Sequence, residues 1–322
     1  MGIIAFLKSQ FICHLLICYI FVVTGLIINL LQLCTLIIWP INKQLYRRIN
    51  CRLAYCIASQ LVWLLEWWSC TECTLYTDQK DYIKYGKENA IVILNHNYEI
   101  DFLCGWDFCE RFGVLGFLIH CEGTRFTEKK HQISMQVAEA KGLPKLKYHL
   151  LPRTKGFALT VQCLRNAVPA VYDATLNFRN GENPTLLGTL HGKKYHADLY
   201  VRRIPLEEIP EDEGECAAWL HKLYQEKDML QEEYFKRGFY PGTPIVPAKR
   251  PWVLVNWLFW AALLLFPLFK LVANMICNRS SLTLITFSLI IVAASVGMRW
   301  MIGMTEIEKG SSYGNNGMNR KN

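Results

Sequence analysis

The chain has 322 residues, of which 52% are hydrophobic and 19% are charged, and its formal net charge is +8. This composition argues against a purely soluble protein, and the charge favours anionic lipid headgroups or phosphorylated substrates over nucleic acid as partners. The 13 cysteines are an odd number and many lie in apolar stretches, so no disulfide framework is predicted. Cys70 and Cys73 form a lone C-x-x-C motif, and without a second pair at zinc spacing no metal site is predicted.

A membrane anchor is the first predicted element. The segment from Phe11 to Trp39 has no charged side chain and is longer than the ~20 residues that a helix needs to cross a bilayer. The next apolar stretch, Leu53 to Trp68, contains Gln60 and three tryptophans, so we expect it to lie in the membrane interface, with a buried core helix as the alternative. Residues 1–77 are therefore predicted to form the N-terminal membrane anchor and an interfacial helix.

The polar middle of the chain, residues 78–247, alternates strand and helix patterns. Strands are predicted at Ala90–Leu94, Leu115–Cys121, Ala167–Leu176 and Ala197–Ile204, and helices at Ser134–Lys141, Gly156–Asn166 and Glu215–Arg237. Such alternation is typical of an α/β domain, in which helices flank a mixed, largely parallel sheet.

Two further apolar segments, Val253–Phe269 and Leu282–Met298, carry no charge, so residues 248–303 are predicted to form a C-terminal transmembrane hairpin. Residues 304–322 form a polar tail that we expect to be disordered. Basic residues follow the first span and flank the hairpin: Lys43, Arg47, Arg48, Arg52, Lys249, Arg250 and Arg299. The positive-inside rule therefore predicts that the middle domain and the C-terminus face the cytosol.

A histidine and a carboxylate follow the first predicted strand of the middle domain. His96 and Asp101 can meet on one turn, where Asp101 would fix one imidazole tautomer and leave the other nitrogen free to accept a proton. Ligands bind at the carboxyl ends of strands in α/β sheets, which favours a catalytic pair over a purely structural histidine. The pair forms a general base without a protein nucleophile, which suits a reaction in which the substrate's own hydroxyl attacks.

A second cluster, Glu122-Gly123-Thr124-Arg125, follows the next predicted strand. The glycine permits close approach of a ligand to the backbone, the arginine offers a fork of donors for a phosphate, and the threonine adds a hydroxyl. An ordinary turn with a surface arginine is the alternative. Because the cluster follows a hydrophobic strand and accompanies the histidine pair, we favour phosphate binding.

A third segment, Leu150–Gly156, contains Pro152, Arg153 and Lys155 within a run of basic residues. Its charge would attract CoA phosphates or anionic headgroups, with a solvated basic surface as the alternative. This segment resembles the proline-centred fourth block of the glycerolipid acyltransferases. The His-x4-Asp and Glu-Gly-Thr-Arg clusters resemble motifs of the same family.

The resemblance extends over nearly the whole chain and includes Leu64–Ser69, Asp101–Trp106 and Glu306–Ser311. The sequence is similar to the 1-acylglycerol-3-phosphate O-acyltransferase (lysophosphatidic acid acyltransferase) family, closest to its vertebrate delta/gamma branch. The resemblance implies a multi-pass protein of the endoplasmic reticulum membrane that acts in phospholipid biosynthesis. It would transfer an acyl group from acyl-CoA, a co-substrate, to the sn-2 hydroxyl of lysophosphatidic acid, giving phosphatidic acid without a cofactor or metal.

One block of that family has no counterpart. Arg111-Phe112-Gly113-Val114-Leu115-Gly116 runs directly into Phe117, where the second block, a basic motif after an aromatic-rich helix, would be expected. The domain is therefore predicted to be internally shortened near residues 116–117. The alternative function is a catalytically impaired membrane protein that binds lipid or acyl-CoA or pairs with full-length siblings. A lipid hydrolase is the weaker hypothesis, because no Gly-x-Ser-x-Gly elbow supplies a nucleophile.

Overall fold

The computed structural model describes residues 3–112, 115–278 and 281–305. These residues divide into two compact units. The helical unit takes those within Met1–Cys70, Leu186–Lys193 and Lys249–Met304, and the sheet unit takes those within Thr71–Thr185 and Lys194–Ala248. The chain therefore leaves the sheet unit once, at residues 186–193, before it returns to complete the sheet.

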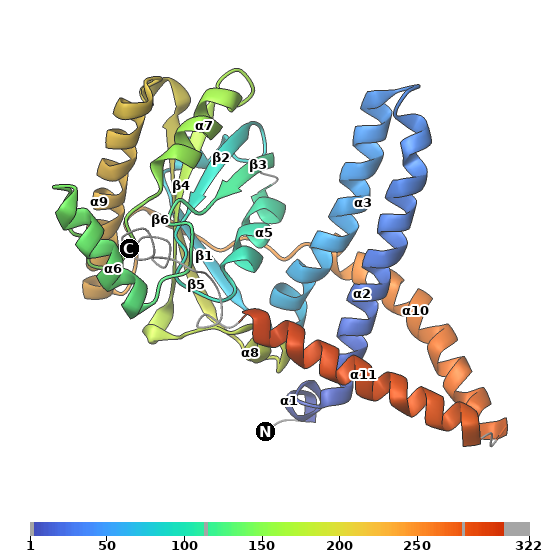
Figure 1. Cartoon of the computed structure of the whole chain (residues 1–322). Helices are drawn as coiled ribbons and strands as arrows, with labels where there is room; N and C mark the ends of the chain where they lie inside the picture. The colour runs from blue at the N-terminus through green and yellow to red at the C-terminus, as the bar shows by residue number, and fades with distance from the viewer. Residues whose placement is uncertain (1–2, 113–114, 279–280, 306–322) are drawn as a thin grey trace, which may run out of the picture. The chain divides into compact units, whose positions relative to one another are not determined.

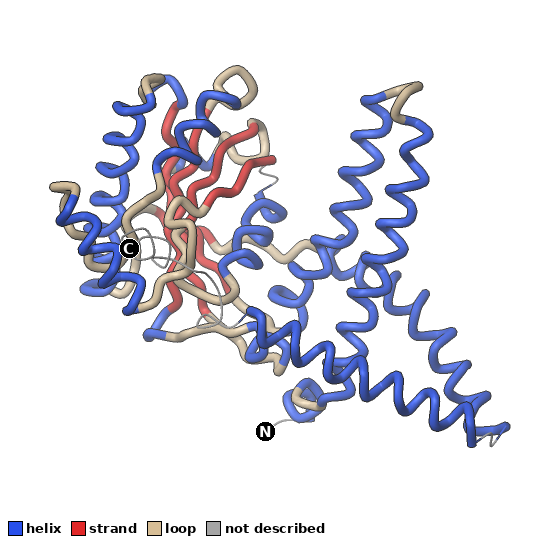
Figure 2. The backbone as a smooth tube through the Cα atoms, viewed as in Figure 1, coloured by secondary structure: helices blue, strands red, loops and turns tan. Residues whose placement is uncertain are grey.

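A six-stranded sheet is the centre of the second unit (Figures 1 and 2). Its strands are β1 (Glu72–Thr77), β2 (Asn89–Leu94), β3 (Leu115–Ile119), β4 (Ala170–Phe178), β5 (His196–Pro205) and β6 (Thr243–Ile245), in the order β3-β2-β4-β5-β1-β6. The pairs β2–β3, β2–β4 and β1–β5 are parallel, whereas β4–β5 and β1–β6 are antiparallel. The predicted mixed sheet is confirmed.

Helices cover both faces of this sheet (Figure 1). They are α4 (Gln79–Tyr82), α5 (Asp101–Phe112), α6 (Glu128–Ala140), α7 (Thr154–Leu164) and α9 (Glu213–Arg237). Ile91 and Ile93 of β2 share a buried core with α7 and α9, while the neighbouring Leu94 packs toward α5 at Gly105. Strand residues alternate between the two faces of a sheet. Because β2 is apolar from Ala90 to Leu94, it is buried on both faces.

Two strands of the sheet were not predicted. β1 lies before the expected boundary at residues 77 and 78, so the sheet unit begins at Thr71. Its sequence, Glu-Cys-Thr-Leu-Tyr-Thr, is buried only over its second half, and this short apolar signal is weak. β6 has three residues, none of them buried, and so has no hydrophobic pattern at all. Parallel and antiparallel pairing to neighbours, rather than local sequence, defines these two strands.

The first unit is helical. Its elements are α1 (Ile3–Lys8), α2 (Phe11–Cys34), η1 (Thr35–Ile38), α3 (Lys43–Trp63), a π-helical turn η2 (Leu64–Trp68), α8 (Leu186–Leu190), α10 (Pro251–Asn278) and α11 (Ser281–Thr305). Three segments among the described residues are long and apolar enough to cross a membrane: Phe11–Ile38, Pro251–Cys277 and Leu282–Met304. They coincide with the three predicted spans, one N-terminal and two C-terminal.

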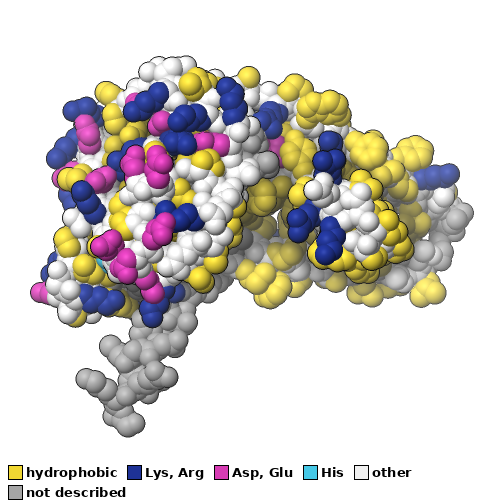
Figure 3. Space-filling view, turned by 90° about the horizontal axis from the view of Figure 1, so that it is seen from above, with side chains coloured by type: hydrophobic (Ala, Val, Ile, Leu, Met, Phe, Trp, Pro, Cys, Tyr) yellow, Lys and Arg dark blue, Asp and Glu magenta, His cyan; other side chains and the backbone are white. Residues whose placement is uncertain are grey.

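The helices α2 and α3 form an antiparallel pair (Figure 1). Near the turn between them, Asn50 Nδ2 donates to Thr35 Oγ1 at 2.8 Å, and at the other end Lys8 Nζ donates to the carbonyl of Trp68. The segment that follows α3 therefore lies beside Lys8, at the N-terminal end of α2. The sequence led us to expect a helix in the membrane interface here, and not one that runs back along α2. Figure 3 shows Lys and Arg side chains near the α2–α3 turn, on a surface that is otherwise largely hydrophobic.

The C-terminal helices also begin and end near this level. Val253 at the start of α10 and Ile302 near the end of α11 belong to one apolar cluster with Trp63. The Arg299 guanidinium lies 5.5 Å from the centre of the Phe11 ring. Lys249, just before α10, lies 5.3 Å from the Trp67 ring. Within the helical unit, the first and last turns of the two helix pairs thus meet around a cluster of tryptophans and basic side chains.

Candidate active site

Two loops at the carboxyl ends of β2 and β3 bring the predicted clusters together. The strands are parallel neighbours, so the segments that follow them emerge at the same edge of the sheet. Asn95 closes β2 by exchanging two hydrogen bonds with the backbone of Leu176 on β4, at 2.8 and 3.0 Å. Its side chain continues the strand pairing for one more step, which fixes where the chain turns toward His96.

His96 and Asp101 form the predicted pair. Nδ1 of His96 lies 3.1 Å from Oδ2 of Asp101, and the same oxygen accepts the backbone N–H of Tyr98 at 2.9 Å. Asp101 is fully buried at the first residue of α5, where the positive end of the helix dipole favours a carboxylate. The contact fixes a proton on Nδ1 and leaves Nε2 of His96 as the basic nitrogen.

The protonation of this pair follows from its surroundings. Burial, together with the nearby charges of Arg125 and Lys130, lowers the pKa of His96 to about 4. Burial raises the pKa of Asp101 to about 7, against the opposing effect of the Tyr98 N–H. The imidazole of His96 is therefore neutral at physiological pH, as a general base must be.

A second histidine supports the first. The ring of His120, directly after β3, stacks on the ring of His96 with 4.1 Å between centroids and 20° between planes. His120 Nδ1 lies 3.0 Å from the carbonyl of Leu94, and burial lowers the pKa of His120 to about 4, so its ring is a neutral platform. His120 was not among the predicted site residues. Its position at a strand end, two residues before Glu122, could have indicated a place in the site.

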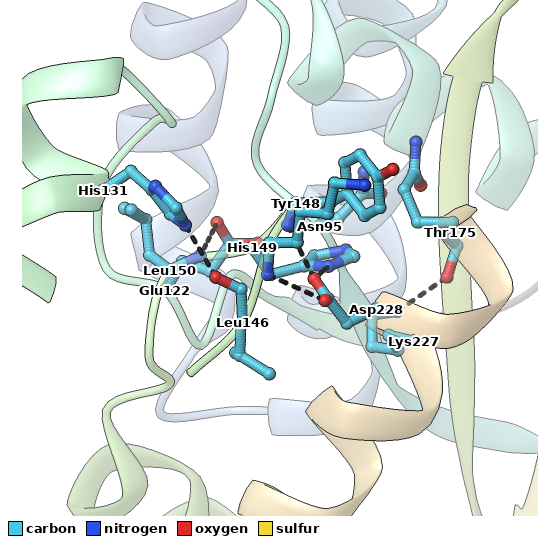
Figure 4. Close-up of polar contacts among 12 residues, drawn as sticks. Asn95, Glu122, His131, Leu146, Tyr148, His149, Leu150, Thr175, Lys227 and Asp228 are labelled. Atoms are coloured by element: carbon cyan, nitrogen blue, oxygen red, sulfur yellow. Dashed lines mark hydrogen bonds and ion pairs between the residues drawn. The ribbon is translucent and has the colours of Figure 1, made fainter. Parts of the chain in front are cut away.

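Glu122 is placed differently from its predicted role as a phosphate ligand. Its carboxyl group is fully buried, where Oε1 accepts the backbone N–H of His96 at 3.1 Å and Oε2 that of Leu150 at 3.5 Å. Figure 4 shows Glu122 beside Leu150. Burial raises the pKa of Glu122 to about 8. A buried carboxyl that accepts backbone N–H groups from two loops holds these loops in place.

The next residues form a basic loop. Gly123 has a φ of +71°, and a Cβ there would lie 2.6 Å from Nε of Arg153, so glycine is required both by conformation and by close approach. Lys130 of α6 donates to the hydroxyl of Thr124 at 2.8 Å and to the carbonyl of Arg125 at 3.3 Å. Lys130 lies in the run of basic residues that ends at Lys155, and its burial could not be predicted from the spacing of that run.

The proline-centred segment is only partly joined to this loop. Arg153 donates its backbone N–H to the carbonyl of Cys121 at 2.7 Å, which brings its side chain over Gly123. Pro152 is buried beneath, whereas Lys155 is exposed at the start of α7 and the described contacts do not connect it with the other site residues. The site thus combines a neutral base with three cations: Arg125, Lys130 and Arg153.

A base and a group of cations can activate a hydroxyl on a substrate that also carries an anionic group. Lys130, buried at the Thr124 hydroxyl, and Arg125 both act on His96 through their charge, so anion and base would be close. Among the described residues, no group of three or more His, Cys, Asp or Glu side chains is arranged to hold a metal ion.

Comparison with known proteins agrees with this arrangement. Residues 188–260 match the family model described as "Acyltransferase C-terminus". The chain is 62% identical to 1-acyl-sn-glycerol-3-phosphate acyltransferase delta of Bos taurus, over 98% of each chain. It is 61% identical to the Homo sapiens delta protein and 56% identical to the Homo sapiens gamma protein, over 100% of this chain and 99% and 100% of theirs. No solved structure matches.

These alignments are longer than the chain itself. They run over 369 to 375 positions, against 322 residues in this protein. The relatives therefore contain residues, within the aligned region, for which this chain has no counterpart. A shortened chain is what the sequence led us to expect.

Proposed function

The chain belongs to the 1-acyl-sn-glycerol-3-phosphate acyltransferase family, and from that premise we propose that it transfers an acyl group from acyl-CoA to lysophosphatidic acid, giving phosphatidic acid. The observation that carries this proposal is the neutral His96, oriented by Asp101 at 3.1 Å and lying in the field of Arg125 and Lys130. Base and phosphate site are adjacent, as a phosphorylated acceptor with a free hydroxyl requires.

In the proposed reaction the two nitrogen atoms of the His96 imidazole have different roles: Nε2 transfers the proton and Nδ1 contacts Asp101. Nε2 of His96 takes the proton of the sn-2 hydroxyl as its oxygen attacks the thioester carbonyl carbon. The new C–O bond forms, the C–S bond breaks, and the CoA thiolate takes the proton back from the imidazolium. Asp101 keeps Nδ1 protonated throughout and stabilises the transient positive charge. General-base assistance of this kind contributes roughly 10²–10⁴-fold to the rate.

The phosphate of the acceptor is held by Arg125, Lys130 and Arg153. Arginine supplies a planar fork of donors for phosphate oxygens, and lysine adds a point charge. The same anion would offset the positive field of Arg125 and Lys130 at His96, one cause of its lowered pKa. The pKa of His96 therefore rises when the acceptor binds, and the base becomes stronger in the complex that needs it.

The alternative is a catalytically impaired membrane protein that keeps its ligands or pairs with full-length siblings. It is favoured by the alignments, which are longer than the chain. Under our proposal the missing stretch lies near residues 116–117 and includes the family's second basic block. Against complete loss of function, β3 still pairs in parallel with β2 from Asn89–Leu115 to Ile93–Ile119, so the loops after both strands still meet.

One experiment separates these functions. The purified chain in lipid nanodiscs is given radiolabelled acyl-CoA with either lysophosphatidic acid or the corresponding monoacylglycerol, which has the hydroxyl but no phosphate. We expect labelled phosphatidic acid from the first acceptor and little product from the second. Binding of both substrates without any product would support the impaired protein, and equal use of both acceptors would refute the phosphate site.

The location in the cell is part of the proposal: a multi-pass protein of the endoplasmic reticulum membrane with the catalytic unit in the cytosol. The helical unit supports one feature of it. Lys8, Trp68 and Lys249 lie at one end of that unit, while Arg47 and Arg48 lie toward the α2–α3 turn. The helix α3 is not among the three described segments apolar enough to span; our proposal has it cross the bilayer beside α2, so that the N-terminus and the catalytic unit lie on the same side of the membrane. The basic residues near the turn, which we first counted as cytosolic, no longer support that orientation.

A further inference from the structure

The segment from Lys147 to Arg153 has neither helix nor strand, yet its backbone is held along its length. Its N–H groups at residues 147, 148, 150, 151 and 153 are all bound by oxygens from elsewhere in the fold. Two of these contacts lead into the active site, since Leu150 donates to Glu122 at 3.5 Å and Arg153 donates to the carbonyl of Cys121 at 2.7 Å. The position of this segment therefore affects both the base and a phosphate ligand.

A single carboxylate on α9 holds the beginning of the segment. Asp228 accepts the backbone N–H of Lys147 at 2.8 Å and that of Tyr148 at 2.7 Å, and Nδ1 of His149 lies 3.1 Å from the same group. Figure 4 shows Tyr148 and His149 beside Asp228. Burial would raise the pKa of Asp228, but the bonds from His149 and the two N–H groups outweigh it, and the pKa is lowered. The group is therefore ionised and accepts all three bonds.

The neighbouring residue fixes α9 to the sheet. Lys227, almost fully buried, donates to Oδ1 of Asp173 at 2.6 Å, to the carbonyl of Ala174 at 2.7 Å and to the hydroxyl of Thr175 at 3.0 Å. All three acceptors are on β4, the strand beside β2. Of these two consecutive residues of α9, Lys227 points to the sheet and Asp228 points to the segment. The contacts of Lys227 therefore fix the position of Asp228.

We propose that Asp228 is a positioning residue for acyl transfer: it holds the segment 147–153 so that Leu150 supports Glu122 beneath His96 and Arg153 lies over Gly123. The inference rests on the proposed function, because it assigns Arg153 to the acceptor's phosphate. The residue lies within the matched C-terminal family region, far along the chain from His96. The route from Asp228 to His96 runs by hydrogen bonds to residues 147–149 and along the backbone to Leu150. Leu150 then donates to Glu122, which also accepts the backbone N–H of His96.

The test compares Asp228→Asn with Glu232→Gln. Both changes remove one negative charge from the same helix near Lys147, whose Nζ lies 3.7 Å from Glu232. Only Asp228→Asn places an amide NH₂ where a backbone N–H needs an acceptor. Dissociation constants for a soluble short-chain lysophosphatidic acid are measured by calorimetry in nanodiscs, and hydrogen exchange is followed over residues 147–151. We expect Asp228→Asn to bind about tenfold more weakly and to exchange at least about tenfold faster, while Glu232→Gln matches the parent.

A second variant guards against misfolding. Ser134→Ala removes one hydroxyl, the acceptor of the Leu151 N–H at 2.7 Å, and should weaken binding severalfold in the same direction. A dissociation constant describes the folded molecules alone, so a purely structural role would lower the number of sites without changing it. Parental affinity in both variants would overturn the positioning role. Failure of the parent to bind lysophosphatidic acid would instead overturn the proposed function, and the exchange data would still report whether Asp228 holds the segment.

Discussion

At the scale of single residues, His96 must be neutral before the reaction and positively charged during it. Burial, with the charges of Arg125 and Lys130, lowers its pKa to about 4 and so secures the neutral form. Asp101, 3.1 Å away, stabilises the cation when it forms. The cations that keep the base neutral are also those proposed to bind phosphate, so acceptor binding and base strength are coupled.

The coupling predicts a pH effect of Arg125→Gln. Removing the positive charge stabilises the imidazolium, so the pKa of His96 rises from about 4 toward its ordinary value of 6.5. Since only the neutral imidazole accepts the proton, the acid limb of kcat/KM moves to higher pH. The measurement is a pH–rate profile, with Lys145→Gln as control because Lys145 is exposed and paired with Glu139. An acid limb that stays in place in Arg125→Gln would contradict the electrostatic argument.

Gly123 offers a second test at this scale. Both Gly123 and Gly142 have positive φ, at +71° and +65°, and an alanine in that region is strained by ~1–2 kcal/mol. Only at Gly123 does the new Cβ meet Arg153, at 2.6 Å, whereas nothing lies within 4 Å of it at Gly142. We expect similar losses of stability in the two alanine variants, but a raised KM for lysophosphatidic acid only in Gly123→Ala. Equal KM values would show that Arg153 does not serve the acceptor.

The sequence predicted some of these residues and not others, for physical reasons. His96 and Asp101 were found because a strand precedes them and their spacing allows contact. His120 and Lys130 were missed because ring stacking and burial depend on how β3 and α6 pack, which spacing does not show. Glu122 was predicted as a site residue that contacts phosphate, whereas its carboxyl group accepts backbone N–H groups of His96 and Leu150. A motif shows which residues cluster but not which way each side chain points.

At the scale of elements, β2, β3, β4 and β5 were predictable from the sequence, whereas β1 and β6 were not. The strand β2 is an apolar run after Asn89, and β4 is buried along its whole length with apolar and polar residues in alternation. By contrast, β6 is almost entirely exposed and is recognisable only by its pairing with β1. The return of α3 alongside α2 was also missed, because its first half carries four basic residues and its amphipathic pattern does not indicate what it packs against.

The shortened segment gives a prediction at this scale. Restoring to the chain, near residues 116–117, the residues that the relatives have and this protein lacks should raise acyl transfer by about 10²-fold, since small misplacements of substrates can lower rates by that factor. Both chains should insert in membranes equally, because the helical unit is unchanged. Turnover is measured at matched expression. Comparable specific activity would mean that the second block is dispensable and that the site at β2 and β3 is sufficient.

At the scale of the whole molecule, the basic and aromatic side chains of the helical unit bear on the membrane topology. Lys8 contacts Trp68, and Lys249 and Arg299 lie beside aromatic rings of the same unit. Tryptophan and basic side chains are typical of the membrane–water boundary. In the proposed topology, where α3 crosses the bilayer beside α2, the N-terminus, the catalytic unit and the end of α11 lie on one side.

Protease protection tests this topology. Epitope tags placed at the N-terminus and beside Asp212 should both be removed from sealed microsomes, because the proposed topology puts each of them in the cytosol. A tag inserted at Asn42, in the α2–α3 turn, should be protected if α2 crosses the bilayer, and serves as the internal comparison. Protection of the N-terminal tag together with loss of the Asp212 tag would show a single crossing and refute the paired arrangement of α2 and α3.

The central claim is that His96 is the base for acyl transfer to lysophosphatidic acid, and His96→Ala tests it most directly. The purified variant, the parent and the control His196→Gln, whose histidine is partly exposed at the start of β5, are assayed with radiolabelled acyl-CoA. We expect His96→Ala to lose ~10²–10⁴-fold in kcat while it still binds lysophosphatidic acid, because the cations remain. Turnover by His96→Ala at the parent's rate would contradict the account.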